Sequence, residues 1–321
     1  MTHPLSPKTL RCLLPLLAVL LCATPAWAEA PEAAVPESAP RGMTLGQSLI
    51  LGVVEGITEY LPVSSTGHLI VLQRLMGIGV HPDEKDAADA YAIVIQAGAI
   101  FAVIGLYFGF FKRMLFGFLG KDPKGLRLAT NLILAFLPAA FLGLTAHRLI
   151  KDALFGVKPI AVAWFVGGVA ILAVGRWKRE HKDWGGEDLL DLRWSGALII
   201  GLMQCIAVWP GTSRSLVTIL GGILVGLSLQ SAVIFSFLLG AITLCASTAY
   251  DSLYHGQVMI EAFGWTPLLV GFGAAFVSAA VTVRWLINYL KSHGLNLFGY
   301  YRIAIALITA GLIAAGILDP N

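Results

Sequence analysis

The chain has 321 residues, of which 57% are hydrophobic and only 13% are charged, and its mean hydropathy is +0.79. Soluble domains carry roughly 25% charged residues, so this composition argues against a water-soluble fold. The net charge is +3, and the Lys and Arg residues gather in a few loops rather than along one stripe. This distribution orients a membrane protein and gives no footprint for nucleic acid.

Residues 1–28 are expected to be a cleaved signal peptide. Two basic residues precede the apolar run 12–22, and Ala-Trp-Ala at 26–28 offers small residues for cleavage. An uncleaved membrane anchor is the alternative, although the apolar run is short for a span. Residues 29–44 begin with a stretch rich in Pro, Ala and Glu and are expected to form a disordered periplasmic tether.

Six apolar stretches are long enough to cross a membrane as helices. Basic residues cluster after the first, third and fifth stretches, so the positive-inside rule places those loops in the cytoplasm. The loops around 148–158 and 251–264 are then external, and the second of them has neither Lys nor Arg. The six predicted spans are 91–111, 127–146, 159–175, 231–250, 266–290 and 302–318.

Two further apolar stretches, 45–77 and 194–227, are interrupted near the middle by a proline and small polar residues. The interruptions are LPVSSTG at 61–67 and WPGTSRS at 209–215. Each stretch has the length of two half-helices with a turn at depth, so we expect two re-entrant hairpins that return to the side they entered from. A full span at either place would invert every later loop, against the charge pattern.

The two halves of the chain resemble each other. Gly52-Val53-Val54-Glu55 corresponds to Gly201-Leu202-Met203-Gln204, and each is followed by Pro and then by hydroxyl residues. Each half contains one hairpin and three spans, and this odd number of spans turns the second half upside down. The predicted fold is an all-α integral membrane domain over 45–321, with six transmembrane helices and two re-entrant helical hairpins in an inverted repeat. Its repeats are expected at about 45–176 and 194–318.

Glu55 and Glu59 lie four residues apart, so both carboxylates project from one face of a helix. Carboxylates in hydrocarbon are costly, and neither has a Lys or Arg at helical spacing to neutralise it. We therefore interpret the pair as functional, with helix stabilisation near an interface as the alternative. Oxygen ligands suit Mg²⁺ or Ca²⁺ rather than Zn²⁺, so Glu55 and Glu59 are also the candidate metal ligands.

Hydroxyl residues and a histidine surround the start of the returning half-helix of the first hairpin. They are Ser64, Ser65, Thr66 and His68. Free amide groups at a helix start favour an anion, and Ser65 could attack phosphorus if His68 or Glu59 removed its proton. Helix capping is the structural alternative, but it accounts for one hydroxyl and not for three beside a His and two acids.

In the second hairpin, Arg214 follows Ser213. A guanidinium can donate two parallel hydrogen bonds to phosphate, so we interpret both residues as phosphate-binding. An Arg that extends to lipid headgroups is the alternative. If the repeats meet, Arg214 holds phosphate where Ser65 attacks. Gln96 and Gln204 are isolated amides in apolar segments and are assigned only a supporting, interhelical role.

The segments LGVVEGITEYLPVSSTGHL and WPGTSRS resemble the motifs of the undecaprenyl-diphosphate phosphatases linked with bacitracin resistance, from about Leu45 to the C-terminus. The resemblance implies hydrolysis of undecaprenyl diphosphate to undecaprenyl phosphate and inorganic phosphate. It implies a site open to the periplasm in a bacterial inner membrane, and recycling of the lipid carrier for peptidoglycan synthesis. The resemblance implies that Ser65 is the nucleophile and that His68 is an acid/base or a phosphate ligand. It implies that Glu55 and Glu59 form the acidic motif and that Ser213 and Arg214 bind phosphate. Ser64 and Thr66 complete the candidate substrate site.

Two positions depart from the family's pattern. Leu216 stands where Gly is typical, and Ala92 stands where an acidic residue often precedes the Val-Ile-Gln run. The first departure puts in doubt the close packing behind the second motif. The second puts in doubt any metal-binding or proton-transfer role that an acid at position 92 would have.

A polyprenyl-phosphate flippase is the main alternative function, because inverted repeats with broken helices are a transporter architecture. An intramembrane Ser hydrolase acting on peptide or acyl bonds is a second alternative, but a buried Arg suits phosphate better than an acyl oxyanion. The expected partners are a polyprenyl diphosphate lipid and the bilayer, with no nucleic acid. The sequence leaves open a homodimer, and it leaves open whether Ser65 forms a phospho-enzyme or His68 activates water.

Overall fold

The computed structural model describes residues 42–79, 82–154, 156–180 and 186–319. Within these residues every regular element is a helix, with one isolated parallel bridge between Glu187 and Leu227. The predicted signal peptide and the predicted tether up to residue 41 lie outside the described residues. Of the tether's last residues, Met43 is buried and Thr44 caps the first described helix.

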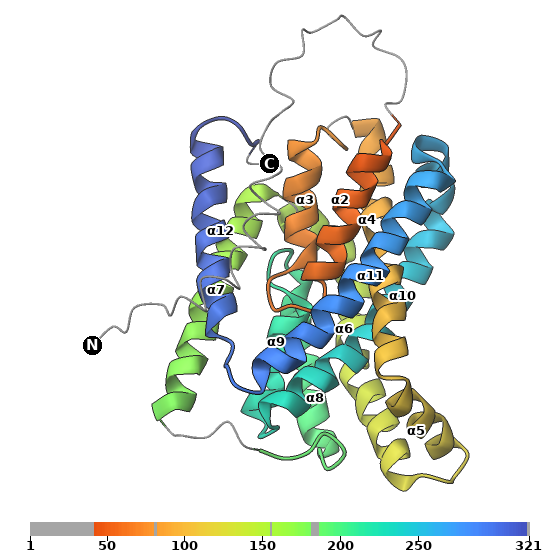
Figure 1. Cartoon of the computed structure of the whole chain (residues 1–321), viewed down its shortest axis with the longest axis vertical. Coiled ribbons are helices and arrows are strands. Elements are labelled where there is room, and N and C mark those ends of the chain that lie inside the picture. Colours follow the sequence, from red (N-terminus) through yellow and green to blue (C-terminus); the bar gives the residue numbers. More distant parts are fainter. Residues whose placement is uncertain (1–41, 80–81, 155, 181–185, 320–321) are drawn as a thin grey trace, which may run out of the picture. The chain divides into compact units, whose positions relative to one another are not determined.

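Each stretch predicted as a re-entrant hairpin folds as a pair of short helices. The first pair is α2 (Leu45–Thr58) with α3 (Ser65–Leu75), and the second is α8 (Trp194–Gln204) with the 3₁₀ helix η1 (Cys205–Val208) and α9 (Arg214–Leu224). The two pairs lie in the upper and lower parts of Figure 1, with their connecting turns toward the middle. Helices of this length are too short to cross the hydrocarbon core, which needs about 20 residues.

The second helix of each pair begins in the same unusual way. Ser64 precedes α3 with a φ of 72°, and Ser213 precedes α9 with a φ of 77°. Residues other than Gly rarely adopt a positive φ. Each Ser side chain accepts a hydrogen bond from a backbone N–H in the first turn, that of Gly67 for Ser64 and that of Leu216 for Ser213. These matching caps support the predicted repeat and place Leu216 in a buried first turn.

Six helices in the described part of the chain are long and apolar enough to cross a membrane, which confirms the predicted number of spans by length and composition. They are α4 (Pro82–Leu106), α6 (Pro123–Leu154), α7 (Val157–Glu180), α10 (Leu229–Phe263), α11 (Trp265–Leu290) and α12 (Asn296–Ala314). The all-α membrane fold is therefore confirmed.

The two predicted external loops are wrong in conformation, because α6 continues to Leu154 and α10 continues to Phe263. With 35 residues, α10 is roughly 52 Å long, whereas the hydrocarbon core is about 30 Å thick. Its last turns contain no proline, and the helix ends at Gly264, whose φ is 79°. A lack of basic residues indicates the side of a segment but not its conformation.

A further short helix, α5 (Phe108–Phe118), lies in the first predicted cytoplasmic loop, so the preceding span ends earlier than expected. Arg113 donates to both carboxylate oxygens of Asp122 at 2.8 and 3.3 Å, and Asp122 also accepts from the backbone N–H of Gly125. These bonds lower the pKa of Asp122 to about 2. They fix the turn between α5 and α6.

The two hairpins pack reciprocally, since α2 lies along α11 and α8 lies along α6. The first helix of each hairpin therefore packs on the second span of the other repeat. Gly52 and Gly201, at matching positions, permit these contacts: a Cβ on Gly52 would collide with the backbone of Gly271, and one on Gly201 with the backbone of Ala135. Small residues allow helices in membranes to approach closely. Equivalent spans also pair, α4 with α10 and α7 with α12.

Candidate active site

The turns of the two hairpins meet through polar groups. Ser215 of the second hairpin donates a 2.7 Å hydrogen bond to the carbonyl oxygen of Leu61 in the first. Arg214 forms an ion pair with Glu59, with 2.9 Å between Nη2 and Oε1. The structure thus brings the two predicted motifs together across the repeat boundary.

Glu59 ends α2 and is the centre of this contact. Its Oε2 accepts from the hydroxyl of Ser65 and, at 3.1 Å, from Nε2 of Gln96. Its Oε1 accepts from Arg214. Glu59 and Ser65 are both buried. A carboxylate that already accepts the proton-bearing hydroxyl of a Ser has the geometry of a general base acting on a nucleophile.

The guanidinium of Arg214 is held on two sides. Nη1 donates to the carbonyl oxygen of Ser236 at 2.8 Å, and Nη2 donates to Glu59. Its central carbon lies 5.6 Å from the centre of the Tyr60 ring, a cation–π distance. The remaining nitrogen, Nε, is buried and has no hydrogen-bond partner among the described residues.

His68 lies in α3, next to the turn of the first hairpin. It does not line either of the two cavities that adjoin Ser65, which are described below. Its Nδ1 is 2.6 Å from the carbonyl oxygen of Ser64, and its Nε2 is 2.8 Å from the hydroxyl of Tyr301. A carbonyl only accepts, so Nδ1 carries the hydrogen, and in a neutral ring Nε2 accepts from Tyr301. The ring also stacks on Tyr301. This placement favours a role in positioning the Ser64 turn.

Arg302 of α12 holds both turns from the same side. Its guanidinium donates to four carbonyl oxygens, those of Pro62, Ala163, Trp164 and Gly211. Its side chain is fully buried, and α12 begins at Asn296, so the predicted start of the last span at residue 302 was too late. The signal was present in the sequence, since Arg302 is the one charged residue in 297–314, and charges inside apolar spans are functional candidates.

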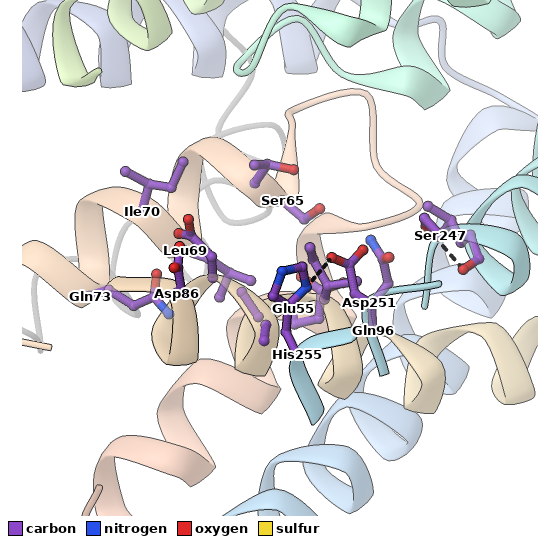
Figure 2. Close-up of a pocket in the computed structure, with 16 residues that line it drawn as sticks. Glu55, Ser65, Leu69, Ile70, Gln73, Asp86, Gln96, Ser247, Asp251 and His255 are labelled. Carbon is purple, nitrogen blue, oxygen red and sulfur yellow. Dashed lines mark hydrogen bonds and ion pairs between the residues drawn. The ribbon is translucent and has the colours of Figure 1, made fainter. Parts of the chain in front are cut away.

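Two cavities adjoin Ser65. The first, of about 290 Å³, is shown in Figure 2 and is lined by the acidic residues Glu55, Asp86, Asp89 and Asp251 together with His255. The second, of about 240 Å³, is lined by Glu59, Ser64, Gln204, Trp209, Ser213 and Arg214. Ser65, Thr66 and Gln96 line both. The predicted nucleophile therefore lies between an acidic cavity and one rich in hydrogen-bond donors.

Glu55 lines the acidic cavity, as does Ala92 at the position where the family often has an acid. Glu55 is 1% exposed, and neither of its carboxylate oxygens has a hydrogen-bond partner in the described part of the chain. The charged groups of Glu59 and Arg214 are close enough to act on it electrostatically. Glu55 is thus the predicted site residue whose acceptor capacity is unused.

The residues present fit a divalent cation only in combination with substrate. No cluster of three or more His, Cys, Asp or Glu side chains that could hold a metal ion occurs among the residues that the structure describes. Both oxygens of Glu59 accept from protein donors, so of the predicted pair of metal ligands only Glu55 has free acceptor oxygens among the described residues. Mg²⁺ is commonly held by one or two carboxylates together with substrate phosphates, and this arrangement is compatible with that mode.

Residues 48–308 match the family model described as bacitracin resistance protein BacA. The undecaprenyl-diphosphatase of Sorangium cellulosum is 42% identical over 266 residues, which cover 83% of this chain and 85% of that protein. Undecaprenyl-diphosphatase 2 of Rhodospirillum rubrum is 42% identical over 273 residues, covering 85% and 96%. The undecaprenyl-diphosphatase of Methylococcus capsulatus is 42% identical over 275 residues, covering 84% and 96%. Two separated motifs, six apolar helices and similarity over most of its length place this chain in the bacitracin resistance protein BacA family.

Proposed function

We propose that the protein hydrolyses undecaprenyl diphosphate to undecaprenyl phosphate and inorganic phosphate. It is a multi-pass membrane hydrolase, and its family and the names of its relatives support this reaction. The reaction recycles the lipid carrier for peptidoglycan synthesis and confers bacitracin resistance. The observation that carries the site assignment is the Ser65 hydroxyl bonded to Glu59, which is itself paired with Arg214.

In the proposed mechanism, Glu59 takes the proton of Ser65 as Oγ attacks the terminal phosphorus. The bond from that phosphorus to the bridging oxygen breaks, and undecaprenyl phosphate leaves. Arg214 and the amide groups at the start of α9 stabilise negative charge on the transferred group. Glu59 then gives this proton to the departing undecaprenyl phosphate and is ionised again. Water attacks the phosphoserine while Glu59 takes its proton, and the Ser65 oxygen leaves as inorganic phosphate forms and receives that proton from Glu59.

His68 acts, in this proposal, by fixing the turn that presents Ser65. Both ring nitrogens are engaged, with Ser64 and Tyr301, and the ring lines neither cavity. Activation of water by His68 remains the alternative. Ser64, Thr66 and Ser213 line the donor-rich cavity and contribute hydroxyls to phosphate binding.

The headgroup binds in the cavities while the polyprenyl tail lies along the outer faces of the helices. The cavity volumes of about 290 and 240 Å³ lie at or under the lower end of the roughly 300–1,000 Å³ of pockets that enclose a drug-sized ligand, so they suit a diphosphate rather than the whole lipid. We place the site on the periplasmic side of a bacterial inner membrane. Asp251 and His255, which line the acidic cavity, belong to the segment whose lack of basic residues predicts an external location.

A divalent cation, Mg²⁺ or Ca²⁺, would be held by Glu55 together with phosphate oxygens, with Glu59 nearby. When bound, it would neutralise part of the charge of the diphosphate. A homodimer stays a hypothesis, to be tested by the mass of the purified protein in detergent.

Phosphate release from undecaprenyl diphosphate by the purified protein tests the proposal, with Glu59→Gln and Arg214→Ala beside the exposed control Ser292→Ala. Wild type and the control should release phosphate, and the two site variants should be at least about 100-fold slower. Inhibition by EDTA would support the cation. Transport of the lipid across proteoliposomes without phosphate release would instead favour the flippase.

A further inference from the structure

Three buried N–H groups around the donor-rich cavity have no hydrogen-bond partner among the described residues. They are Nε2 of Gln204, Nε1 of Trp209 and Nε of Arg214. Gln204 is 2% exposed. Buried donors without partners are costly and rare in native structures, and three around one cavity are a feature that calls for an explanation.

The chemistry of the cavity wall indicates what would satisfy these groups. Indole Nε1 and guanidinium Nε can only donate, so the missing partner must accept. The acid on the wall, Glu59, already accepts from Ser65, Gln96 and Arg214. The cavity therefore has donors in excess and its carboxylate occupied, which suits an anion with several acceptor oxygens.

Comparison of the two repeats shows why the amide matters. Gln204 occupies the position in the second hairpin that Glu55 occupies in the first, by the correspondence of Gly201 with Gly52. Glu55 lines the acidic cavity, whereas Gln204 lines the donor-rich one. A carboxylate at 204 would add a second acid to the wall that already carries Glu59. The amide keeps this cavity receptive to an anion.

We propose that Gln204 and Trp209 bind a phosphate group of the substrate, in a subsite that they share with Arg214. This goes beyond the interhelical role that the sequence assigns to Gln204, and it rests on the proposed phosphatase function. Ser65 lies on the wall of the same cavity, so the bound phosphate is next to the attacking hydroxyl. The group is either the terminal phosphate that is released or the phosphate that stays on the lipid, and both present the same oxygen acceptors.

Kinetics of conservative variants test this subsite. Trp209→Phe keeps an aromatic ring but removes the N–H, and Gln204→Met keeps the length but removes the amide. Each should raise KM for undecaprenyl diphosphate by roughly tenfold or more, as expected for one lost hydrogen bond to a charged group, with kcat changed less. Gln204→Glu should be more impaired than Gln204→Met. Trp265→Phe and Gln257→Met are matched controls, because both residues are exposed and line neither cavity.

Product inhibition then identifies which phosphate is bound. A weaker inhibition of both variants by inorganic phosphate would assign the released phosphate to the subsite, and a weaker inhibition by undecaprenyl phosphate alone would assign the retained one. Thermal unfolding in detergent checks that each variant folds; if Gln204→Met does not, Trp209→Phe decides. Unchanged KM and unchanged inhibition by both products, in folded and active variants, would overturn the subsite and leave the phosphatase function standing. A wild type that releases no phosphate would instead overturn the function.

Discussion

At the level of single residues, the role of each polar side chain in the site follows from its hydrogen-bond partners. Glu59 accepts from the hydroxyl of Ser65, whereas His68, a residue type often used in acid–base catalysis, is bonded to Ser64 and Tyr301. The sequence made both Glu59 and His68 candidate bases, because it shows which residues are close along the chain but not where the imidazole ring of His68 points. The geometry separates them into a proton acceptor and a positioning residue.

His68→Gln should lower kcat, because the Ser64 turn loses one of its supports, but it should leave the shape of the pH–rate profile unchanged. The profile of kcat measured for wild type and variant checks this. Tyr301→Phe, which removes only the hydroxyl bonded to Nε2, should behave in the same way and more mildly. Loss of one limb of the profile in His68→Gln would show that the imidazole itself transfers a proton.

Arg302, which the sequence placed at the start of the last span, is buried inside α12 and should have a large effect on stability. Arg302→Met leaves four carbonyl oxygens without this donor, each at a cost of roughly 1–3 kcal/mol where no other donor replaces it. We expect a clearly lower unfolding temperature in detergent, with reduced activity. Arg284→Met, at an exposed position of α11, should have little effect. Equal stability of the two variants would contradict the role of Arg302.

At the level of helices, the hairpins are placed by close contact with spans of the opposite repeat. Gly52→Val should push α2 away from α11, since a side chain there meets the backbone of Gly271. Overpacking of this kind costs roughly 1–3 kcal/mol and should also reduce activity, because α2 carries Glu55 and Glu59 follows its last residue. Gly46→Val, in the same helix but with open space around it, is the matched control. Unfolding temperature and phosphate release measured together check both effects.

The sequence predicted the six spans and the two hairpins in their order, but it predicted neither α5 nor all of the helix ends. Proline and hydroxyl clusters interrupt both hairpins, and those interruptions are the turns that the structure contains. The extension of α10 to Phe263 was missed because hydropathy reports burial in lipid, and a helix can continue into water. The contact of Gly201 with Ala135 could not be predicted, because it depends on how the repeats pack.

At the level of the whole molecule, the charge pattern predicts the orientation in the membrane. A single Cys introduced at Glu261, at the end of α10, should react with a membrane-impermeant thiol reagent added to spheroplasts. A Cys at Lys121, after α5, should not react until the membrane is opened. The native Cys205 and Cys245 are replaced first, because Cys245 is exposed. The reverse labelling pattern would contradict a periplasmic site.

The packing of the two repeats determines how much of the candidate site could be predicted from the sequence. Two short motifs separated by about half of the chain were expected to meet because inverted repeats bring broken helices together. The ion pair of Glu59 with Arg214 is in keeping with that expectation. Trp164, Tyr301 and Arg302 come from the third span of each repeat and support the turns from behind, and no local motif marks such support.

In the proposed reaction, Ser65 attacks the terminal phosphorus with Glu59 as its base. The most direct test is to react the protein with undecaprenyl diphosphate labelled in its terminal phosphate, quench with acid, and locate the label by peptide mapping. We predict label on Ser65 in the wild type, and neither label nor phosphate release in Ser65→Ala. Phosphate release by Ser65→Ala at the wild-type rate, with no label on the wild-type protein, would contradict the account and favour direct attack by water.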